Sequence, residues 1–90
     1  MIWTIGFSRD ADKFLARNHM EAEAIFELIK LAVRKFRGET VNLNIRKLKG
    51  VWQGYYRIRR GDLRIIASFN FDHNAALVEV IDWRGSVYKD

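Results

Sequence analysis

The sequence predicts an α+β domain in which a two-helix hairpin packs on one face of a small antiparallel sheet, in the order β-α-α-β-β-β. Two observations carry this prediction. One long stretch in the first half of the chain repeats its apolar residues at helical spacing, and the second half holds β-branched and aromatic stretches separated by short turns. The 90 residues form one domain, residues 1–90, and an apolar content of 49% is enough for its core.

The first half of the chain predicts one strand and two helices. Ile2–Phe7 is rich in β-branched and aromatic residues, which is typical of a short strand. Ser8 then offers an N-cap hydroxyl for a helix from about Arg9 to Arg17. The clearest helix runs over Met20–Arg37, where apolar residues recur every three or four positions, and Gly38 is its natural end.

The second half predicts three strands of an antiparallel meander. Val51–Arg60 is the first, and Gly61-Asp62 is a two-residue turn with glycine first, as a type II′ hairpin prefers. Leu63–Phe69 returns, residues 70–74 turn again, and Ala75–Trp83 is the last strand. We expect the N-terminal strand to join this sheet at an edge or in its centre.

Positive charge is concentrated in one stretch of the chain. Between Arg46 and Arg64 there are seven basic residues and one acid, whereas the rest of the chain is close to charge-balanced, so this stretch accounts for the net charge of +5. Cations gathered on a short rigid element repel one another. This arrangement indicates contact with a polyanion, and the commonest polyanion in a cell is nucleic acid.

The predicted hairpin register gathers three arginines. If Gly61-Asp62 is the turn, Arg59 faces Arg64 across the hairpin and Arg57 lies two positions away on the same side. The guanidinium groups then lie within roughly 5–8 Å of one another, and directly opposed like charges destabilise a strand pair. Because the guanidinium fork suits phosphate, we interpret this face as an oxyanion site. The opposite face carries Ile58, Ile65 and Ala67, which the helices can cover.

Simpler explanations exist for each basic and aromatic residue. The arginines can pair with acids such as Glu79 or Asp82, or reach into water, and Lys47 and Lys49 fit an ordinary solvated edge. The aromatic residues near the hairpin are Trp52, Tyr55 and Tyr56. They can stack on nucleic-acid bases, although such residues belong more often to the core of a small domain.

Several function classes find no support in the sequence. The chain has no cysteine, which excludes disulfides and a thiolate metal site, and it has no metal-ligand spacing, glycine-rich phosphate loop or nucleophile–His–acid set. His19 and His73 fall in predicted turns without partners. No apolar stretch reaches ~18 residues, and the first residues do not resemble a signal peptide. We therefore expect a cytoplasmic protein with no metal, no cofactor and no membrane contact.

One motif in the basic stretch is specific enough to suggest a family. It runs Leu48-x-Gly50, then Gly54-Tyr55-Tyr56-Arg57-Ile58-Arg59-Arg60-Gly61-Asp62-Leu63-Arg64-Ile65-Ile66. This motif closely resembles the core signature of the RelE/ParE superfamily, the toxins of bacterial and archaeal toxin–antitoxin pairs. The tail Arg84–Lys89 resembles the C-terminal Arg-x-x-x-Tyr element of the RelE branch. The resemblance implies a RelE-like fold over nearly the whole chain.

The resemblance also implies an activity and its residues. RelE-type toxins are ribosome-dependent mRNA endonucleases (mRNA interferases), in which an RNA 2′-OH attacks its own 3′-phosphate. Five positions match the family, namely Arg57, Arg59, Arg64, Arg84 and Tyr88. We expect catalytic roles for Arg59, Arg64, Arg84 and Tyr88, and RNA-binding roles for Arg57 and for the neighbouring cations Lys47, Lys49 and Arg60. The family often has lysines where this chain has arginines, one of them a proposed proton acceptor. An arginine stays protonated at neutral pH, so Tyr88 is the candidate for proton transfer.

The expected partners follow from the same resemblance. They are a cognate antitoxin protein, the ribosome and mRNA, and no small-molecule cofactor is implied. Two alternatives stay open: a ParE-like toxin that inhibits DNA gyrase without cleaving RNA, and a basic RNA-binding domain or toxin relic without activity. The RelE branch is favoured because all five family positions, including Arg84 and Tyr88, hold suitable residue types.

Overall fold

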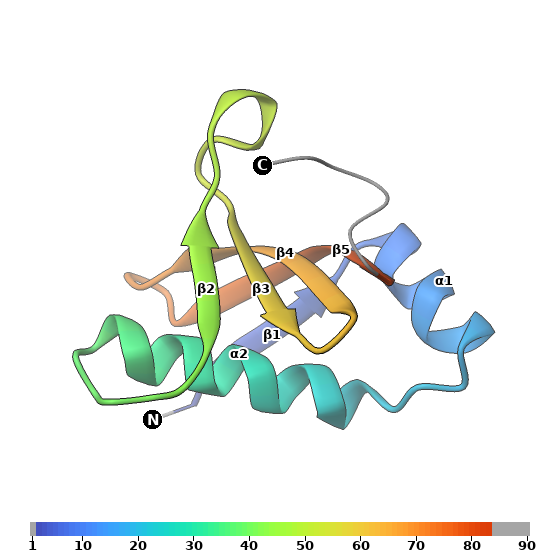
Figure 1. The fold of residues 1–90 in the computed structure, drawn as a ribbon, viewed down its shortest axis with the longest axis horizontal. Coiled ribbons are helices and arrows are strands. Elements are labelled where there is room, and N and C mark those ends of the chain that lie inside the picture. Colours follow the sequence, from blue (N-terminus) through green and yellow to red (C-terminus); the bar gives the residue numbers. More distant parts are fainter. Residues whose placement is uncertain (1, 84–90) are drawn as a thin grey trace.

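The computed structural model describes residues 2–83 and confirms the α+β class (Figure 1). Two helices and five strands follow one another within these residues. In chain order they are β1 Thr4–Phe7, α1 Arg9–Arg17, α2 Ala22–Phe36, β2 Asn44–Lys47, a short 3₁₀ turn Gly50–Trp52, β3 Tyr56–Arg60, β4 Leu63–Asn70 and β5 Ala75–Trp83. None of the helices in this part of the chain is long and apolar enough to cross a membrane.

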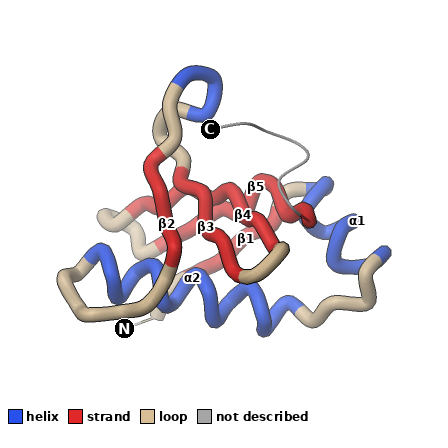
Figure 2. Tube along the Cα trace, in the orientation of Figure 1, coloured by secondary structure: helices blue, strands red, loops and turns tan. Residues whose placement is uncertain are grey.

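The strands of the described chain form one sheet in the order β1-β5-β4-β3-β2 (Figure 2). The pairs β2/β3, β3/β4 and β4/β5 are antiparallel, as the meander predicts. β1 lies at the edge and pairs with β5 in parallel, so the sheet is mixed rather than purely antiparallel. Both helices lie between β1 and β2 in the chain, and β2, β3 and β4 then precede β5, so the parallel partners β1 and β5 are the first and last strands of the described chain.

The start of the basic stretch differs from the prediction. Residues 44–47 form a strand, β2, that the predicted order lacks, and the strand expected over Val51–Arg60 begins only at Tyr56. The 3₁₀ turn over residues 50–52 and the positive φ of Gly54, 94°, interrupt an extended backbone at that point. The basic stretch therefore spans β2, the β2–β3 loop, β3 and the start of β4, rather than a single hairpin.

Ser8 ties the first helix to the sheet. Its hydroxyl oxygen accepts a hydrogen bond from the backbone N–H of Ala11 at 3.1 Å, so the predicted N-cap is confirmed. The same hydroxyl donates to the backbone oxygen of Glu79 at 2.7 Å. Glu79 is the extra residue of β5 in a β-bulge, because the pairing with β4 shifts between Ile66 and Ala67. The start of α1 is thereby fastened to β5.

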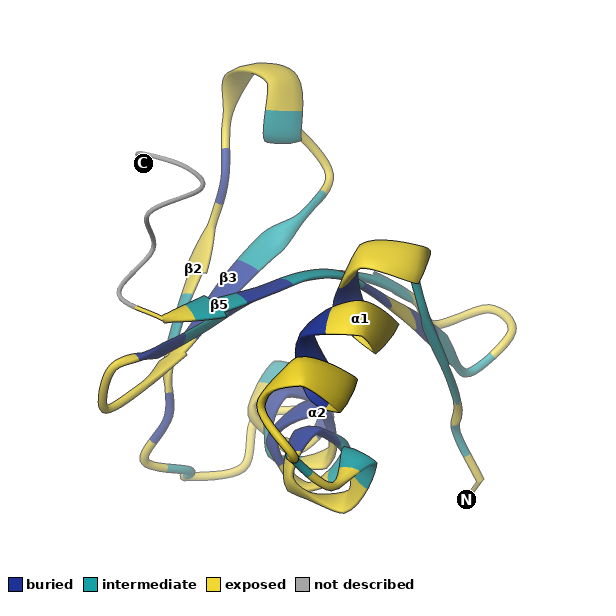
Figure 3. Cartoon of the chain, turned by 90° about the vertical axis from the view of Figure 1, so that its right-hand side faces the viewer, coloured by how far each residue is buried: buried dark blue, intermediate teal, exposed yellow. Residues whose placement is uncertain are grey.

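The core lies between the helices and one face of the sheet (Figure 3). From α2, Ile25 and Ile29 are fully buried, and from the sheet Ile58, Ile65 and Val78 are fully buried. Because side chains alternate along a strand, this packing leaves the neighbouring residues of β3 and β4 on the opposite face of the sheet. That face carries Arg46, Arg57, Arg59 and Arg64 of the basic stretch.

Candidate RNA-cleaving site

Two rows of side chains cross the sheet on the face opposite the helices. The strand register defines both rows, and neighbours within a row lie about 5 Å apart. The first row is Asn44, Arg59, Arg64 and Asp82, and the second is Arg46, Arg57, Ile66 and Val80. Four of these eight positions are arginines and one is an acid, so the surface is cationic.

Arg59 and Arg64 form the centre of the first row. They are direct partners across the β3–β4 hairpin, as predicted, and Gly61 adopts the positive φ, 57°, that the turn requires. Arg59 is exposed and Arg64 is half-buried. The Nη1 of Arg64 donates to the backbone oxygens of Gly61 at 2.6 Å and Leu63 at 3.2 Å, which holds its guanidinium beside the turn. Arg64 is thus positioned by its own hairpin.

Arg57 does not present an open guanidinium, contrary to the prediction that it emerges beside the other two arginines. Its strand position is as predicted, but the residue is only 7% exposed. Its Nη2 donates to the side-chain oxygen of Asn44 at 2.7 Å. A buried charge needs such partners. Arg57 therefore acts in this structure as a support that joins β3 to β2.

Asn44 is the residue of this face that the sequence prediction misses. It lies on β2, opposite Arg59, and accepts the hydrogen bond from Arg57. The signal for this strand is present in the sequence, because Val41, Leu43 and Ile45 alternate with polar residues at the period of a strand. Recognising that alternation adds β2 to the sheet and brings Asn44 into the first row.

We expect replacement of Asn44 by alanine to lower the free energy of unfolding by about 1.5–3 kcal/mol, because the hydrogen bond that it accepts comes from a buried charge. Urea unfolding followed by circular dichroism measures this change. Asn42→Ala is the matched control, because Asn42 is exposed and precedes β2. An equal loss in the two variants would show that the bond to Arg57 contributes nothing.

The other predicted RNA-binding residues lie apart from this face. The register pairs Arg60 with Leu63 and Lys47 with Tyr56, which assigns both cations to the helix-facing side of the sheet. Lys49 lies in the β2–β3 loop, which rises away from the sheet in Figure 1. Both lysines line a hollow of about 420 Å³ at the base of this loop. All three cations are exposed.

The aromatic residues of the β2–β3 region pack against other aromatic rings. The rings of Trp52 and Tyr55 lie 5.3 Å apart in an edge-to-face arrangement, and both residues are half-buried. Tyr56 packs against Phe36 of α2 with ring centroids 4.8 Å apart. Tyr56 therefore belongs to the core side, as aromatic residues of small domains commonly do.

Within residues 2–83 the arginine face holds no histidine. His19 and His73 are exposed and belong to neither row, and the Nδ1 of His73 lies 3.3 Å from the side-chain oxygen of Asn70. Arg84 and Tyr88, the remaining predicted catalytic residues, lie outside the described residues. The described part of the site therefore offers charge stabilisation from arginines that cannot act as bases at neutral pH.

No protein-family model matches the chain, and no curated protein matches its sequence significantly. Solved structures do match its fold. A metal-bound toxin from Helicobacter pylori is 14% identical, with a TM-score of 0.69 over 97% of this chain and 100% of that one. A mutant of YafQ from E. coli is 15% identical, with a TM-score of 0.66 over 98% and 100% of the two chains.

Two further matches come from protein complexes. The RelBE2 toxin–antitoxin complex from Mycobacterium tuberculosis is 17% identical, with a TM-score of 0.62 over 93% of this chain and 100% of that one. The YoeB–YefM complex from Staphylococcus aureus is 17% identical, with a TM-score of 0.61 over 92% and 98%. Because these likenesses extend over nearly the full length of each chain, the protein has the RelE-like α+β fold of these structures.

Proposed function

We propose that this protein is the toxin of a toxin–antitoxin pair and that it is an mRNA interferase, an endoribonuclease that cleaves mRNA on the ribosome. One observation carries the proposal: within a RelE-like fold, Arg59 and Arg64 are paired directly on the sheet face opposite the helices. Two directly opposed guanidinium groups repel each other, and an anion bound between them relieves that repulsion; the acid of this row, Asp82, lies on the side of Arg64 away from Arg59. A phosphodiester supplies that anion, and each guanidinium offers it several N–H donors.

The proposed reaction is an intramolecular transesterification. The 2′-oxygen of a ribose forms a bond to the adjacent phosphorus while the bond from phosphorus to the 5′-oxygen breaks, leaving a 2′,3′-cyclic phosphate and a 5′-OH. The 2′-OH loses its proton to a base, and the leaving 5′-oxygen takes up a proton. Arg59 and Arg64 stabilise the charge that builds on the phosphate oxygens. Arg84 is proposed to join them, and Tyr88 to transfer a proton.

The proposed partners have different support. The RelBE2 match is a toxin–antitoxin complex, and it supports a cognate antitoxin as the protein partner of this chain. Ribosome and mRNA are proposed from the resemblance of the hairpin motif to the RelE/ParE superfamily and of the tail Arg84–Lys89 to its RelE branch. A ribosome that orients the mRNA supplies part of the catalysis, since correct positioning alone is worth several orders of magnitude in rate. The protein would then act in the cytoplasm.

The experiment compares mRNA cleavage with and without bacterial ribosomes in a purified translation system, with the new 5′ ends mapped. We expect cuts within codons of the ribosomal A site, only when ribosomes are present, and products that end in a 2′,3′-cyclic phosphate and a 5′-OH. Arg84→Ala and Tyr88→Phe should weaken the cuts. Arrested growth with intact mRNA and lowered gyrase supercoiling would instead support the ParE-like alternative. If neither mRNA cleavage nor growth arrest occurs, the result would indicate an inactive RNA-binding domain.

A further inference from the structure

The proposed cleavage needs a proton acceptor close to the bound phosphate. The 2′-oxygen attacks the phosphorus next to it, so the base that takes its proton must lie within hydrogen-bond reach of the same nucleotide. Arginine stays protonated at neutral pH, and the side-chain amide of asparagine is not a base. Of the eight positions in the two rows of the described sheet, only Asp82 holds a side chain that can accept a proton.

Asp82 lies at the β5 end of the first row. It is the direct partner of Arg64 across β4 and β5, and Arg59 is the partner of Arg64 on the other side. Partners of this kind have Cβ atoms about 5 Å apart. A phosphate bound by Arg59 and Arg64 therefore has the carboxylate of Asp82 as its neighbour. Because a carboxylate repels the phosphate oxygens, Asp82 is suited to the neutral ribose hydroxyl rather than to the phosphate itself.

The end of β5 holds this carboxylate in place. The backbone N–H of Trp83 donates to the Oδ1 of Asp82 at 2.8 Å. The indole Nε1 of Trp83 in turn donates to the side-chain oxygen of Asn18 at 3.0 Å, and its ring packs against Phe14 of α1 with centroids 5.6 Å apart. A functional group needs this kind of rigid support. An ionised carboxylate offers about four acceptor positions on its two oxygens, so the bond from Trp83 leaves Asp82 able to take up a proton.

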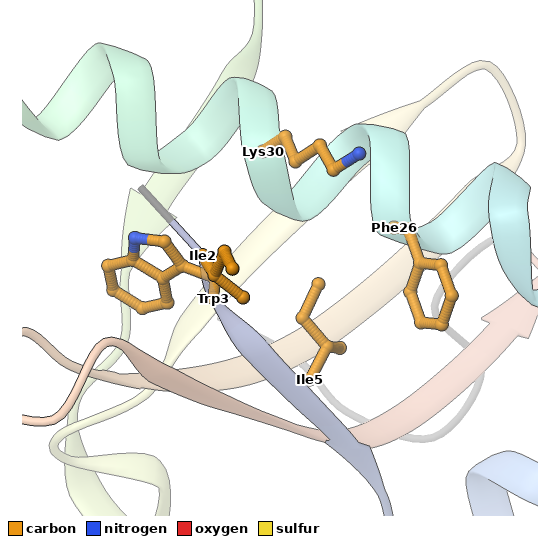
Figure 4. A pocket seen from close by; sticks show the side chains of 5 residues that line it. All are labelled: Ile2, Trp3, Ile5, Phe26 and Lys30. Carbon is orange, nitrogen blue, oxygen red and sulfur yellow. The ribbon is translucent and has the colours of Figure 1, made fainter.

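Two hollows in the surface of the described chain contain no such group. One, of about 360 Å³, lies between β1 and α2 (Figure 4). It is lined by Ile2, Trp3, Ile5, Phe26 and Lys30. The hollow at the base of the β2–β3 loop is lined by Lys47, Leu48, Lys49 and Gln53. Neither set includes a carboxylate or a histidine, so neither hollow offers a base for the reaction.

We propose that Asp82 is the general base of the cleavage reaction, an inference that rests on the proposed function. The proton of the 2′-OH moves to a carboxylate oxygen of Asp82 as the 2′-oxygen bonds to phosphorus and the bond from phosphorus to the 5′-oxygen breaks. Tyr88 then gives its phenolic proton to the leaving 5′-oxygen. Both groups return to their starting protonation states by exchange with water. The simpler role for an acid in this position is an ion pair that only orients Arg64, and the experiment separates the two roles.

The test measures single-turnover cleavage of mRNA on programmed ribosomes by Asp82→Asn. Asparagine keeps the size of the side chain and an oxygen for the N–H of Trp83, but it cannot take up a proton. We expect the rate to fall by about 10²–10⁴-fold, the usual contribution of a general base, with the half-saturating toxin concentration unchanged. Asp62→Asn is the matched control: it removes the same charge from an exposed residue of the β3–β4 turn, outside both rows, and should cleave as fast as the unmodified protein.

Two further comparisons identify the role of Asp82. In the double variant Arg64→Ala/Asp82→Asn the two losses should multiply, because a base and a charge-stabilising group that act on different atoms contribute separately. An mRNA with sulfur in place of the leaving 5′-oxygen needs no proton for its leaving group. With this mRNA Tyr88→Phe should regain the rate of the unmodified protein, whereas Asp82→Asn should keep its full loss.

Three results would overturn the proposal. If the unmodified protein and Asp82→Asn cleave equally fast, Asp82 is not the base, while the proposed nuclease function stands. If the double variant is no slower than Arg64→Ala, Asp82 acts only by orienting Arg64. If Asp82→Asn regains its rate on the sulfur-containing mRNA, Asp82 protonates the leaving group instead. A complete absence of cleavage by the unmodified protein would contradict the proposed function itself, and this inference with it.

Discussion

Arg64→Ala should lower the rate of the proposed ribosome-dependent mRNA cleavage by about 10²–10³-fold, the loss typical of removing one preorganised donor to a developing negative charge. The guanidinium of Arg64 is already held by two backbone oxygens of its own hairpin, at 2.6 and 3.2 Å. It therefore needs little reorganisation when the phosphate gains charge. Arg59→Ala should cause a loss of similar order, because Arg59 is the direct partner of Arg64 across the strands.

Single-turnover cleavage on programmed ribosomes measures this effect, since it separates chemistry from product release. Arg60→Ala is the matched control: it removes the same residue type one position after Arg59, and the register assigns Arg60 to the other side of the sheet. Arg64→Lys keeps the charge but loses the planar fork, so an intermediate rate is expected. If Arg60→Ala loses as much activity as Arg64→Ala, general basicity rather than the paired arginines drives cleavage.

Local signals in the sequence predict a large part of the fold. Three of these signals depend only on residues close together in the chain, and all three are confirmed. They are the N-cap at Ser8, the helical periodicity that ends near Gly38 and the Gly61-Asp62 turn. The turn matters most for the site. A two-residue loop sets the pairing of both strands that it joins, so the opposition of Arg59 and Arg64 follows from the sequence directly.

The features of the fold and of the site that the sequence does not predict depend on contacts between residues that are far apart in the chain. The parallel pairing of β1 with β5 joins residues some 70 positions apart, and no local pattern determines it. The burial of Arg57 requires β2 beside β3, so a prediction without β2 leaves that side chain open. The roles of Arg84 and Tyr88 stay predictions, because both residues lie outside the described part of the chain.

Because side chains alternate along β3 and β4, the residues proposed for catalysis and the residues that stabilise the core lie on opposite faces of the sheet. Arg59 and Arg64 lie on one face of the sheet, whereas Ile58 and Ile65, their immediate neighbours, lie in the core and are fully buried. Removing one of two directly opposed cations relieves their repulsion. We therefore expect Arg64→Ala to change the free energy of unfolding by less than about 1 kcal/mol. A loss of activity in that variant then reports on the site and not on folding.

Ile65 is the residue next to Arg64, but Ile65→Ala should strongly destabilise the protein. We expect it to lower the free energy of unfolding by about 2–5 kcal/mol, the range for truncating a buried isoleucine to alanine. Ile65 pairs with Ile58 on one side and Ile81 on the other, so its loss opens a cavity in the middle of the sheet's core face. For a domain of this size each kcal/mol lowers the Tm by about 4–8 °C. Thermal unfolding followed by circular dichroism should therefore show a fall on the order of 10–30 °C.

Val51→Ala provides the control for this measurement, because Val51 is 95% exposed in the β2–β3 loop and its truncation should change stability by less than about 0.5 kcal/mol. A small domain has only about 5–15 kcal/mol of stability in total, so the core variant should lie close to the limit of folding while the loop variant does not. Equal Tm values for Ile65→Ala and the unmodified protein would mean that Ile65 is not packed in the core. In that case the strand register would be shifted by one residue, which would also move Arg59 and Arg64 away from the open face.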